Sequence, residues 1–286
     1  MSLKPAVNTL PRPFLKWAGG KAQLLPELLS RVPSDFNAYH EPFVGGGALF
    51  FALWREGLLT DKKVFLSDSN PELVNAYEVV RNELDDLLGL LERYQGLNSR
   101  KDYYHIRAEK PRSRVKRAAR LIYLNRTCYN GLYRVNRKGE FNVPFGRYRN
   151  PKIYDPENLR AASEALQGVR ILCEDFGNVL GRAKPGDLVY FDPPYYPLSA
   201  TANFSDYTSG GFDEEDHIRL AGVFAELAKA GVLVMESNSD TGFVREAYRA
   251  WRLHRVQARR PINSRPGGRG AISELIITNY RSKKHA

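Results

Sequence analysis

The tetrapeptide Asp192-Pro193-Pro194-Tyr195 has the residue types needed to hold an amino group on a planar ring. It follows the apolar run Leu188 to Phe191, which predicts a buried strand. Two successive prolines fix φ and donate no N–H, so the Asp192 carboxylate and the Pro193 carbonyl can form a rigid pair of acceptors. An exocyclic amine would donate one N–H to each acceptor, and Tyr195 offers a ring for stacking.

This pair of acceptors suits methyl transfer to nitrogen. In adenine the N6 lone pair is delocalised into the ring, and acceptors for both N–H groups draw it towards tetrahedral character as a methyl group approaches. N6 is not productively accessible inside a duplex, so the base would have to be turned out of the helix. Cytosine N4 or a glutamine amide would fit the same acceptors, and an ordinary proline turn is the alternative without chemistry.

Three other predicted strands end in residues suited to a nucleoside. The strand 38–43 runs into three glycines beginning at Gly45, where a ligand can approach the backbone closely. Phe50 stands where the dinucleotide fingerprint requires a glycine, so a pyrophosphate site is not supported. Asp68 ends the next strand and can accept hydrogen bonds from both hydroxyls of a ribose. Asp175 and Phe176 follow a third strand and offer a carboxylate and a ring face to adenine.

Near the start of the chain, Trp17 and Lys21 flank a glycine pair. Ala22 takes the place of the Ser or Thr with which a phosphate loop binds magnesium, which argues against an ATPase. An aromatic ring and an ammonium group better suit a sulfonium ligand that also carries a carboxylate. We therefore expect a sulfonium nucleoside here.

The positive charge is concentrated in one part of the chain. The net charge is +11, and residues 101–160, with 16 basic and 5 acidic residues, hold the same surplus. Such a stretch in an otherwise neutral enzyme is typical of a module that binds a polyanion, although a solvated arginine-rich surface has the same composition. Cys128 and Cys173 lie in no metal-ligand pattern, so we expect two buried thiols and no metal.

Short β-rich runs alternate with amphipathic stretches along most of the chain. The predicted strands are 38–43, 64–68, 169–173, 187–191, 232–237 and 274–279, and the predicted helices are 21–31, 48–55, 71–83, 214–230 and 241–251. This alternation predicts an α/β fold with a doubly wound, mostly parallel sheet, whose strand ends bring the motifs together.

The alternation stops between residues 84 and 168, where a helical pattern around 115–125 leads into a stretch rich in Arg, Asn, Gly and aromatic residues. We expect residues 1–83 and 169–286 to form a catalytic domain. Residues 84–168 would form an inserted, mainly helical domain that contains a hairpin. A polar stretch over 199–211 predicts a mobile loop.

Together these motifs resemble the Dam-type DNA adenine methyltransferases of the α group, over nearly the whole chain. The resemblance is carried by Pro13-Phe14-Leu15-Lys16-Trp17-Ala18-Gly19-Gly20-Lys21, Glu41-Pro42-Phe43-Val44-Gly45-Gly46-Gly47, Asn130-Gly131-Leu132-Tyr133-Arg134, Phe141-Asn142-Val143-Pro144 and Asp192-Pro193-Pro194-Tyr195. It implies a Rossmann-like fold and transfer of a methyl group from S-adenosylmethionine to N6 of adenine within GATC in double-stranded DNA, with S-adenosylhomocysteine as the product. Action on cytosine N4, or DNA binding without turnover, are the alternatives.

The resemblance also implies a cofactor site. S-adenosylmethionine would lie over Phe43 and Gly45, with its ribose on Asp68. Its adenine would lie beside Asp175 and Phe176, and its methionine end near Trp17, Lys21 and Asp192.

Roles in base recognition carry over in the same way. Lys16 and Tyr148 would contact the first base pair, Leu132 and Pro144 would pack on the thymine methyl group of the third, and Arg134 would read the guanine of the fourth. Tyr129 would insert into the base stack, and Asn130 would face the thymine left without its partner. The remaining basic residues of the inserted domain would contact phosphates or solvent.

The chain has no apolar run of the length that a secretory signal or a membrane span requires, so we expect a cytoplasmic protein without membrane association. We also expect a monomer. A cognate restriction endonuclease would act separately.

Overall fold

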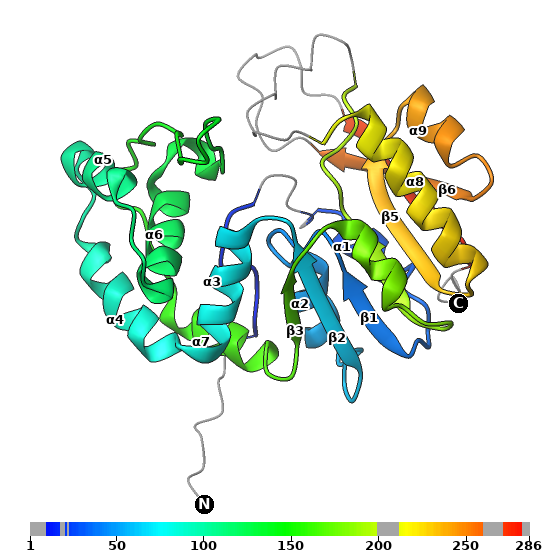
Figure 1. The fold of residues 1–286 in the computed structure, drawn as a ribbon, viewed down its shortest axis with the longest axis horizontal. Coiled ribbons are helices and arrows are strands. Elements are labelled where there is room, and N and C mark those ends of the chain that lie inside the picture. Colours follow the sequence, from blue (N-terminus) through cyan, green and yellow to red (C-terminus); the bar gives the residue numbers. More distant parts are fainter. Residues whose placement is uncertain (1–9, 18–20, 22, 199–211, 260–270, 282–286) are drawn as a thin grey trace, which may run out of the picture.

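The computed structural model describes residues 10–17, 21, 23–198, 212–259 and 271–281. Within these residues the centre of the protein is a seven-stranded sheet with the order β3-β2-β1-β4-β5-β7-β6 (Figure 1). The strands are β1 (Ala38–Glu41), β2 (Lys63–Asp68), β3 (Arg170–Cys173), β4 (Leu188–Phe191), β5 (Leu233–Ser239), β6 (Arg252–Arg259) and β7 (Ala271–Thr278). Strands β1 to β5 are parallel, and β7 pairs antiparallel with β5 and β6. The predicted α/β class with a mostly parallel sheet is confirmed.

Helices cover both faces of the sheet. One hydrophobic core contains α1 (Leu25–Leu29), α2 (Ala48–Arg55), α3 (Pro71–Asn82) and α7 (Pro156–Ala165), and a second contains α8 (Glu214–Lys229) and α9 (Gly242–Ala247). Successive residues of β4 alternate between the cores: Leu188 and Tyr190 join the first, Val189 and Phe191 the second. Because both faces of β4 are buried, its sequence is apolar throughout rather than alternating.

The strand order reverses between β1 and β4, and the chain leaves these neighbours in opposite directions. In open α/β sheets a ligand binds outside the carboxyl ends of the strands at such a switch point. The glycine turn follows β1, and the Asp192 tetrapeptide follows β4. The topology therefore brings these two motifs to the same end of the sheet.

Two helix starts agree with the sequence. Pro71 is the first residue of α3, and the side chain of Asn70 accepts the N–H of Glu72 at 3.0 Å. Asp213 and Asp216 form a reciprocal capping box at the start of α8. The predicted helix starts at residues 71 and 214 are confirmed.

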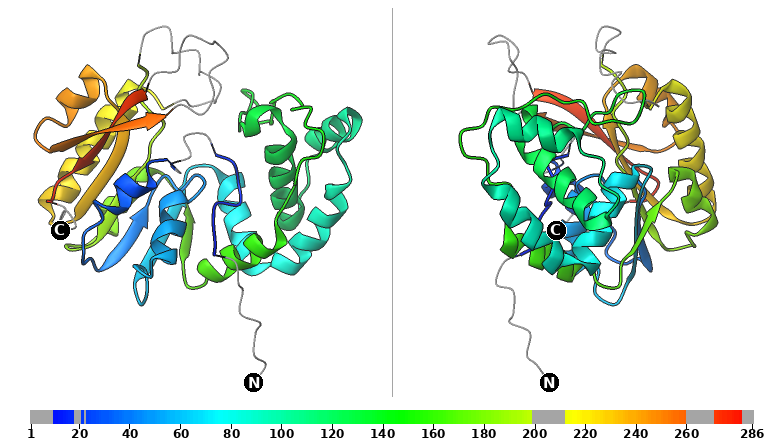
Figure 2. Two further views of the ribbon diagram at one scale, coloured as in Figure 1. Left: turned by 180° about the vertical axis from the view of Figure 1, so that it is seen from behind. Right: turned by 60° about the vertical axis from the view of Figure 1, so that its left-hand side comes forward.

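The inserted segment contains α4 (Leu84–Gln95), α5 (Arg100–Ala108) and α6 (Arg114–Thr127). Helices α4 and α6 pack against α3, and α5 packs against α6 (Figures 1 and 2). A short hairpin follows: Val135 pairs antiparallel with Phe141, and the N–H of Asn142 donates to the Arg134 carbonyl at 3.0 Å. The buried side chains of α4, α5 and α6 belong to the same core as α3. The insert is thus packed onto the sheet domain, and the domain boundaries at 84 and 168 stay a prediction.

Some element predictions were wrong or incomplete. The expected helices 21–31 and 241–251 are shorter, as α1 and α9. Strand β6 was missed because it is an edge strand with charged residues, which lacks the apolar run of a central strand. Helices α4, α5 and α7 were not delimited by the sequence patterns. The loop predicted over 199–211 lies outside the described residues.

Candidate active site and DNA-recognition surface

Asp192 lies at the carboxyl end of β4, and its two oxygens differ in their contacts. Oδ1 forms an ion pair with Lys21 Nζ at 2.8 Å and accepts a hydrogen bond from Ser237 Oγ at 2.9 Å. Both of these contacts are made to Oδ1 and hold the side chain in place. Oδ2 and the carbonyl of Pro193 are the two further acceptors that this turn carries.

The charge at this position is set by burial and by Lys21. Burial raises the pKa of Asp192, whereas the Lys21 ammonium and the Ser237 hydroxyl oppose that rise in pKa. On the neighbouring strands burial raises the pKa of Glu41 to about 8 and that of Glu236 to about 8. Of these three buried carboxyl groups, Asp192 is the one whose charged form is favoured by an adjacent ammonium group.

Tyr195, the last residue of the tetrapeptide, is held by β7 and by Lys21. The Tyr195 hydroxyl donates to Glu274 Oε2 at 2.8 Å, and the Lys21 ammonium lies 4.1 Å from the centre of its ring. Beyond the tetrapeptide, Ser239 Oγ donates to the Tyr196 carbonyl at 2.7 Å. The turn that carries Asp192 is therefore held by side chains from distant parts of the sequence.

The glycine turn after β1 is shaped by the protein's own aromatic side chains. Gly45 and Gly47 have φ of 47° and 68°, in the left-handed region that favours glycine. A Cβ on Gly45 would lie 2.8 Å from Trp17 Cδ1, and one on Gly47 would lie 2.7 Å from the Tyr77 hydroxyl. Packing therefore requires glycine at both positions, independently of any ligand.

Asp68 is fixed beside this turn. Its Oδ2 accepts the N–H of Gly45 at 3.2 Å, and its Oδ1 accepts the N–H of Asn70 at 3.0 Å. Burial raises its pKa to about 6, which the two backbone hydrogen bonds partly oppose. Each oxygen keeps a lone pair, so the carboxylate can still accept two hydroxyls.

Aromatic rings and an ion pair gather at the end of β3. Phe43 stacks on Phe176 with ring centres 5.2 Å apart, and the guanidinium carbon of Arg219 lies 3.8 Å from the centre of the Phe176 ring. Arg219 also forms a bidentate pair with Asp175, at 2.6 and 2.8 Å. The two groups expected to meet adenine thus already contact Arg219.

The residues expected to read DNA lie on the hairpin and its neighbours. Tyr129 and Leu132 are large apolar side chains that are 54% and 41% exposed, and Pro144 is also exposed. Asn130, likewise exposed, has φ 55° in the left-handed region, which asparagine tolerates. The structure thus presents several apolar side chains to solvent on the basic insert.

Two basic readers are positioned by neighbours. Arg134 Nε donates to Asn142 Oδ1 at 2.7 Å, across the hairpin. The Lys16 ammonium lies 5.3 Å from the centre of the Tyr148 ring, so the two residues expected to share a base pair are adjacent.

The family model of the D12 class N6 adenine-specific DNA methyltransferases matches residues 17–262. The chain is 43% identical over 277 residues to the type II methyltransferase M1.LlaDCHI of Lactococcus lactis subsp. cremoris, with 94% of this chain and 95% of the relative covered. It is 43% identical over 288 residues to the type II methyltransferase M.MjaIII of Methanocaldococcus jannaschii, covering 94% and 99%. It is 40% identical over 271 residues to the DNA adenine methylase of Escherichia coli (strain K12), covering 93% and 94%.

The chain belongs to the D12 class of N6 adenine-specific DNA methyltransferases. Its reaction is the methylation of adenine N6 in DNA with S-adenosylmethionine as methyl donor, as the sequence predicted. The further roles of individual residues stay predictions.

Two contacts made by the expected site residues of the methyltransferase were not anticipated from the sequence. Lys21, expected near the methionine end of the cofactor, pairs with Asp192, and the Trp17 ring stacks on Tyr133 with ring centres 5.2 Å apart. Ser237 and Glu274, which contact Asp192 and Tyr195, were not predicted as site residues. The polar run after the apolar part of β5 was a usable signal for Ser237, whereas Glu274 follows no motif.

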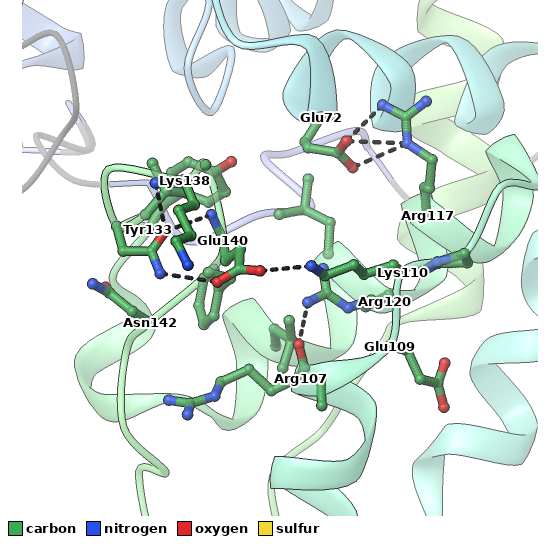
Figure 3. Close-up of a pocket in the computed structure, with 18 of the residues that line it drawn as sticks. Glu72, Arg107, Glu109, Lys110, Arg117, Arg120, Tyr133, Lys138, Glu140 and Asn142 are labelled. Carbon is green, nitrogen blue, oxygen red and sulfur yellow. Dashed lines mark hydrogen bonds and ion pairs between the residues drawn. The ribbon is translucent and has the colours of Figure 1, made fainter.

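A cavity of about 590 Å³ lies in the insert of the methyltransferase and not at Asp192. It is lined by residues of α5, α6, the hairpin and Glu72 of α3, and its lining is mixed in charge. Figure 3 shows the Lys110–Glu140 and Arg117–Glu72 ion pairs in its wall, each 2.6 Å long. These four charged side chains are thus paired within the protein.

Three further findings concern metals, thiols and membranes. The described residues contain no group of three or more His, Cys, Asp or Glu that could hold a metal ion. Cys128 is buried as expected, but Cys173 is exposed, because it ends β3 at the rim of the sheet. No helix in the described part of the methyltransferase is both long and apolar enough to cross a membrane.

Proposed function

We propose that this methyltransferase acts on the adenine of GATC in double-stranded DNA, after the base has turned out of the helix into the Asp192 site. The observation that supports the proposal is that Lys21 and Ser237 both bind Oδ1 of Asp192 and fix the turn that carries Oδ2 and the Pro193 carbonyl. Two acceptors on a rigid turn match the two N–H groups of an adenine amine.

The cofactor site proposed here lies at the switch point between β1 and β4. Asp68 would accept the ribose hydroxyls through the lone pairs that its two backbone hydrogen bonds leave free. Phe43, Gly45 and Trp17 would line the site, with Asp175 and Phe176 beside the adenine once Arg219 moves aside. When bound, S-adenosylmethionine supplies an electrophilic methyl group.

The chain's own residues then orient and polarise the target amine. Asp192 Oδ2 and the Pro193 carbonyl would accept one N–H each, which directs the N6 lone pair out of the ring plane. Positive charge develops on N6 as it is methylated, and the Asp192 carboxylate would stabilise that charge and receive the departing proton. Lys21 and Ser237 keep Oδ1 occupied, so Oδ2 stays directed at the amine. The Tyr195 ring would stack on the base.

The proposed readout of GATC uses the hairpin. Arg134, oriented by Asn142, would donate to the guanine of the fourth base pair, and Leu132 and Pro144 would contact the thymine methyl group. Lys16 and Tyr148 would address the first base pair. Tyr129 would fill the space left by the everted base, and Asn130 would face the unpaired thymine.

Transfer of a labelled methyl group to matched duplexes tests the target. We expect labelling of a duplex with one GATC site, and none of a duplex in which the adenine is replaced by N6-methyladenine on both strands or the site is scrambled. Equal labelling of the GATC and scrambled duplexes would refute the site preference. A duplex in which only cytosines can accept the label distinguishes the cytosine N4 alternative.

Asp192→Ala separates catalysis from DNA binding. The variant should lose methyl transfer and keep nearly all of its DNA affinity, because Asp192 contacts the everted amine and not the duplex. Unchanged turnover would end the proposed mechanism, and turnover absent from both proteins would favour a DNA-binding protein without catalysis.

We further propose that residues 84–168 form the target-recognition domain and that the protein acts as a monomer in the cytoplasm, separately from any endonuclease. The basic surplus of residues 101–160 supports the first point. DNA affinity should accordingly fall steeply with salt concentration. Light scattering after gel filtration checks the monomer.

A further inference from the structure

Residues 16 and 17 connect the recognition hairpin to the glycine turn. The N–H of Lys16 donates to Asn125 Oδ1 at 2.7 Å, and Asn125 Nδ2 donates to the carbonyls of Lys16 at 2.6 Å and Gly131 at 3.1 Å. Asn125 is 1% exposed, so the loss of these hydrogen bonds would leave buried polar groups unpaired. The backbone of Lys16 is therefore fixed to the start of the recognition segment.

The next side chain contacts the hairpin and the glycine turn together. The Trp17 indole stacks on the Tyr133 ring, with ring centres 5.2 Å apart and planes 26° apart. The same indole lies against Gly45 so closely that a Cβ there would be 2.8 Å from its Cδ1. Neither Tyr133 nor Gly45 can move towards the indole without displacing it, because a packed interior does not deform continuously.

Each end of this contact adjoins a proposed binding site. Tyr133 stands between Leu132 and Arg134, the proposed readers of thymine and guanine. Gly45 donates its N–H to Asp68, the proposed ribose acceptor. The Tyr133–Trp17 pair of rings thus joins the hairpin that carries the proposed base readers to the turn beside the proposed ribose acceptor.

We propose that the Tyr133–Trp17 stack couples the two sites, so that cofactor binding raises the affinity for target DNA and DNA binding raises the affinity for the cofactor by the same factor. A cofactor that fixes Gly45 and Trp17 restrains Tyr133, and the hairpin then has less freedom to lose when it binds DNA. Tyr133 is a positioning residue in this scheme, since it acts through its stack on Trp17. The inference rests on the proposed function, which supplies the two ligands.

A four-cornered binding cycle with the wild-type protein tests the coupling. The dissociation constant of a GATC duplex is measured with and without saturating S-adenosylhomocysteine, and that of S-adenosylhomocysteine with and without saturating duplex. We expect tightening of roughly 5-fold or more in both directions, the lower end of usual coupling between sites. If the affinity for each ligand is the same with and without the other ligand, the inference is wrong.

Variants of Tyr133 assign the coupling to the stack. In Tyr133→Ala the coupling factor should fall to within about twofold of one, while each ligand alone still binds. Tyr133→Leu keeps apolar bulk without an aromatic ring and serves if the alanine variant does not fold. Tyr133→Phe retains the ring and should retain the coupling.

Val135→Ala is the matched control, because Val135 lies on the same hairpin and pairs with Phe141. It should keep the wild-type coupling factor. Coupling that survives in Tyr133→Leu, or that is lost equally in Val135→Ala, would overturn the role of the stack. Failure of the wild-type protein to bind either ligand alone would instead refute the proposed function, and this inference with it.

Discussion

Lys21 Nζ lies 2.8 Å from Asp192 Oδ1 and 4.1 Å from the centre of the Tyr195 ring. One ammonium group thus contacts both side chains of the tetrapeptide that are proposed to act on the base. The Lys21 side chain is 7% exposed, so the pair is shielded from solvent and its loss would leave Asp192 buried without a cation. Through these contacts, Lys21 connects the N-terminal part of the chain to the residues that follow β4.

We predict that Lys21→Met lowers the rate of methyl transfer by about 100-fold or more, since the charged acceptor loses its preorganised partner. The pH profile should also move. Without the cation, burial raises the pKa of Asp192 further, so the active carboxylate forms only at higher pH. Single-turnover rates measured across the pH range check both effects.

Lys21→Arg is the control, because it retains a positive charge beside Asp192. It should recover part of the rate and keep the wild-type pH profile. A Lys21→Met variant with an unshifted profile and weaker cofactor binding would place Lys21 at the methionine end of the cofactor instead.

We predict that Arg134→Ala reduces discrimination at the fourth base pair by about 1 to 3 kcal/mol, the usual contribution of a bidentate guanine contact. Asn142→Ala should cause a smaller loss at the same pair, since Asn142 orients the Arg134 guanidinium at 2.7 Å. Competition with duplexes altered at one base pair measures this. Equal weakening on all duplexes would identify Arg134 as a phosphate contact.

The affinity for S-adenosylhomocysteine should depend on pH through Asp68. Burial raises the pKa of Asp68 to about 6, and the ionised form is the better acceptor for two hydroxyls. The affinity for S-adenosylhomocysteine should therefore be highest above that pH and should decrease as the pH falls through it. Calorimetric titrations of wild type and Asp68→Asn check this, and an equal pH dependence in both proteins would count against Asp68.

Arg219 is expected to oppose cofactor binding. Its guanidinium occupies Asp175 and the Phe176 ring, so an adenine at that place must displace it. Since the pair is exposed and worth about 1 kcal/mol at most, Arg219→Gln should tighten S-adenosylhomocysteine binding by up to roughly 5-fold.

Arg249→Gln is the matched control for Arg219, because Arg249 is also exposed and paired, with Glu246 at 2.7 Å. It should leave the cofactor affinity unchanged. Weaker binding in Arg219→Gln alone would mean that the guanidinium contacts the cofactor directly.

Local patterns in the sequence determined the central strands and their ends. A buried parallel strand is apolar throughout, as β4 is, and the acidic residues at the ends of β2 and β3 stand where a doubly wound sheet binds its ligand. The sequence therefore predicted that Asp68, Asp175 and Asp192 would lie at the same edge of the sheet. The charged edge strand β6 carries no such pattern, because one of its sides has no neighbour in the sheet.

Only the tertiary structure decided which side chains touch within that edge. The pairing of Lys21 with Asp192, of Arg219 with Asp175 and of Trp17 with Tyr133 joins segments that are remote along the chain. Taken alone, each of these residues is of a type that is common on protein surfaces or in turns. Hydrophobic packing decides how two segments approach each other, and the distance between their side chains then decides which residues pair. A sequence periodicity of two or 3.6 residues indicates strands and helices but does not encode such pairing.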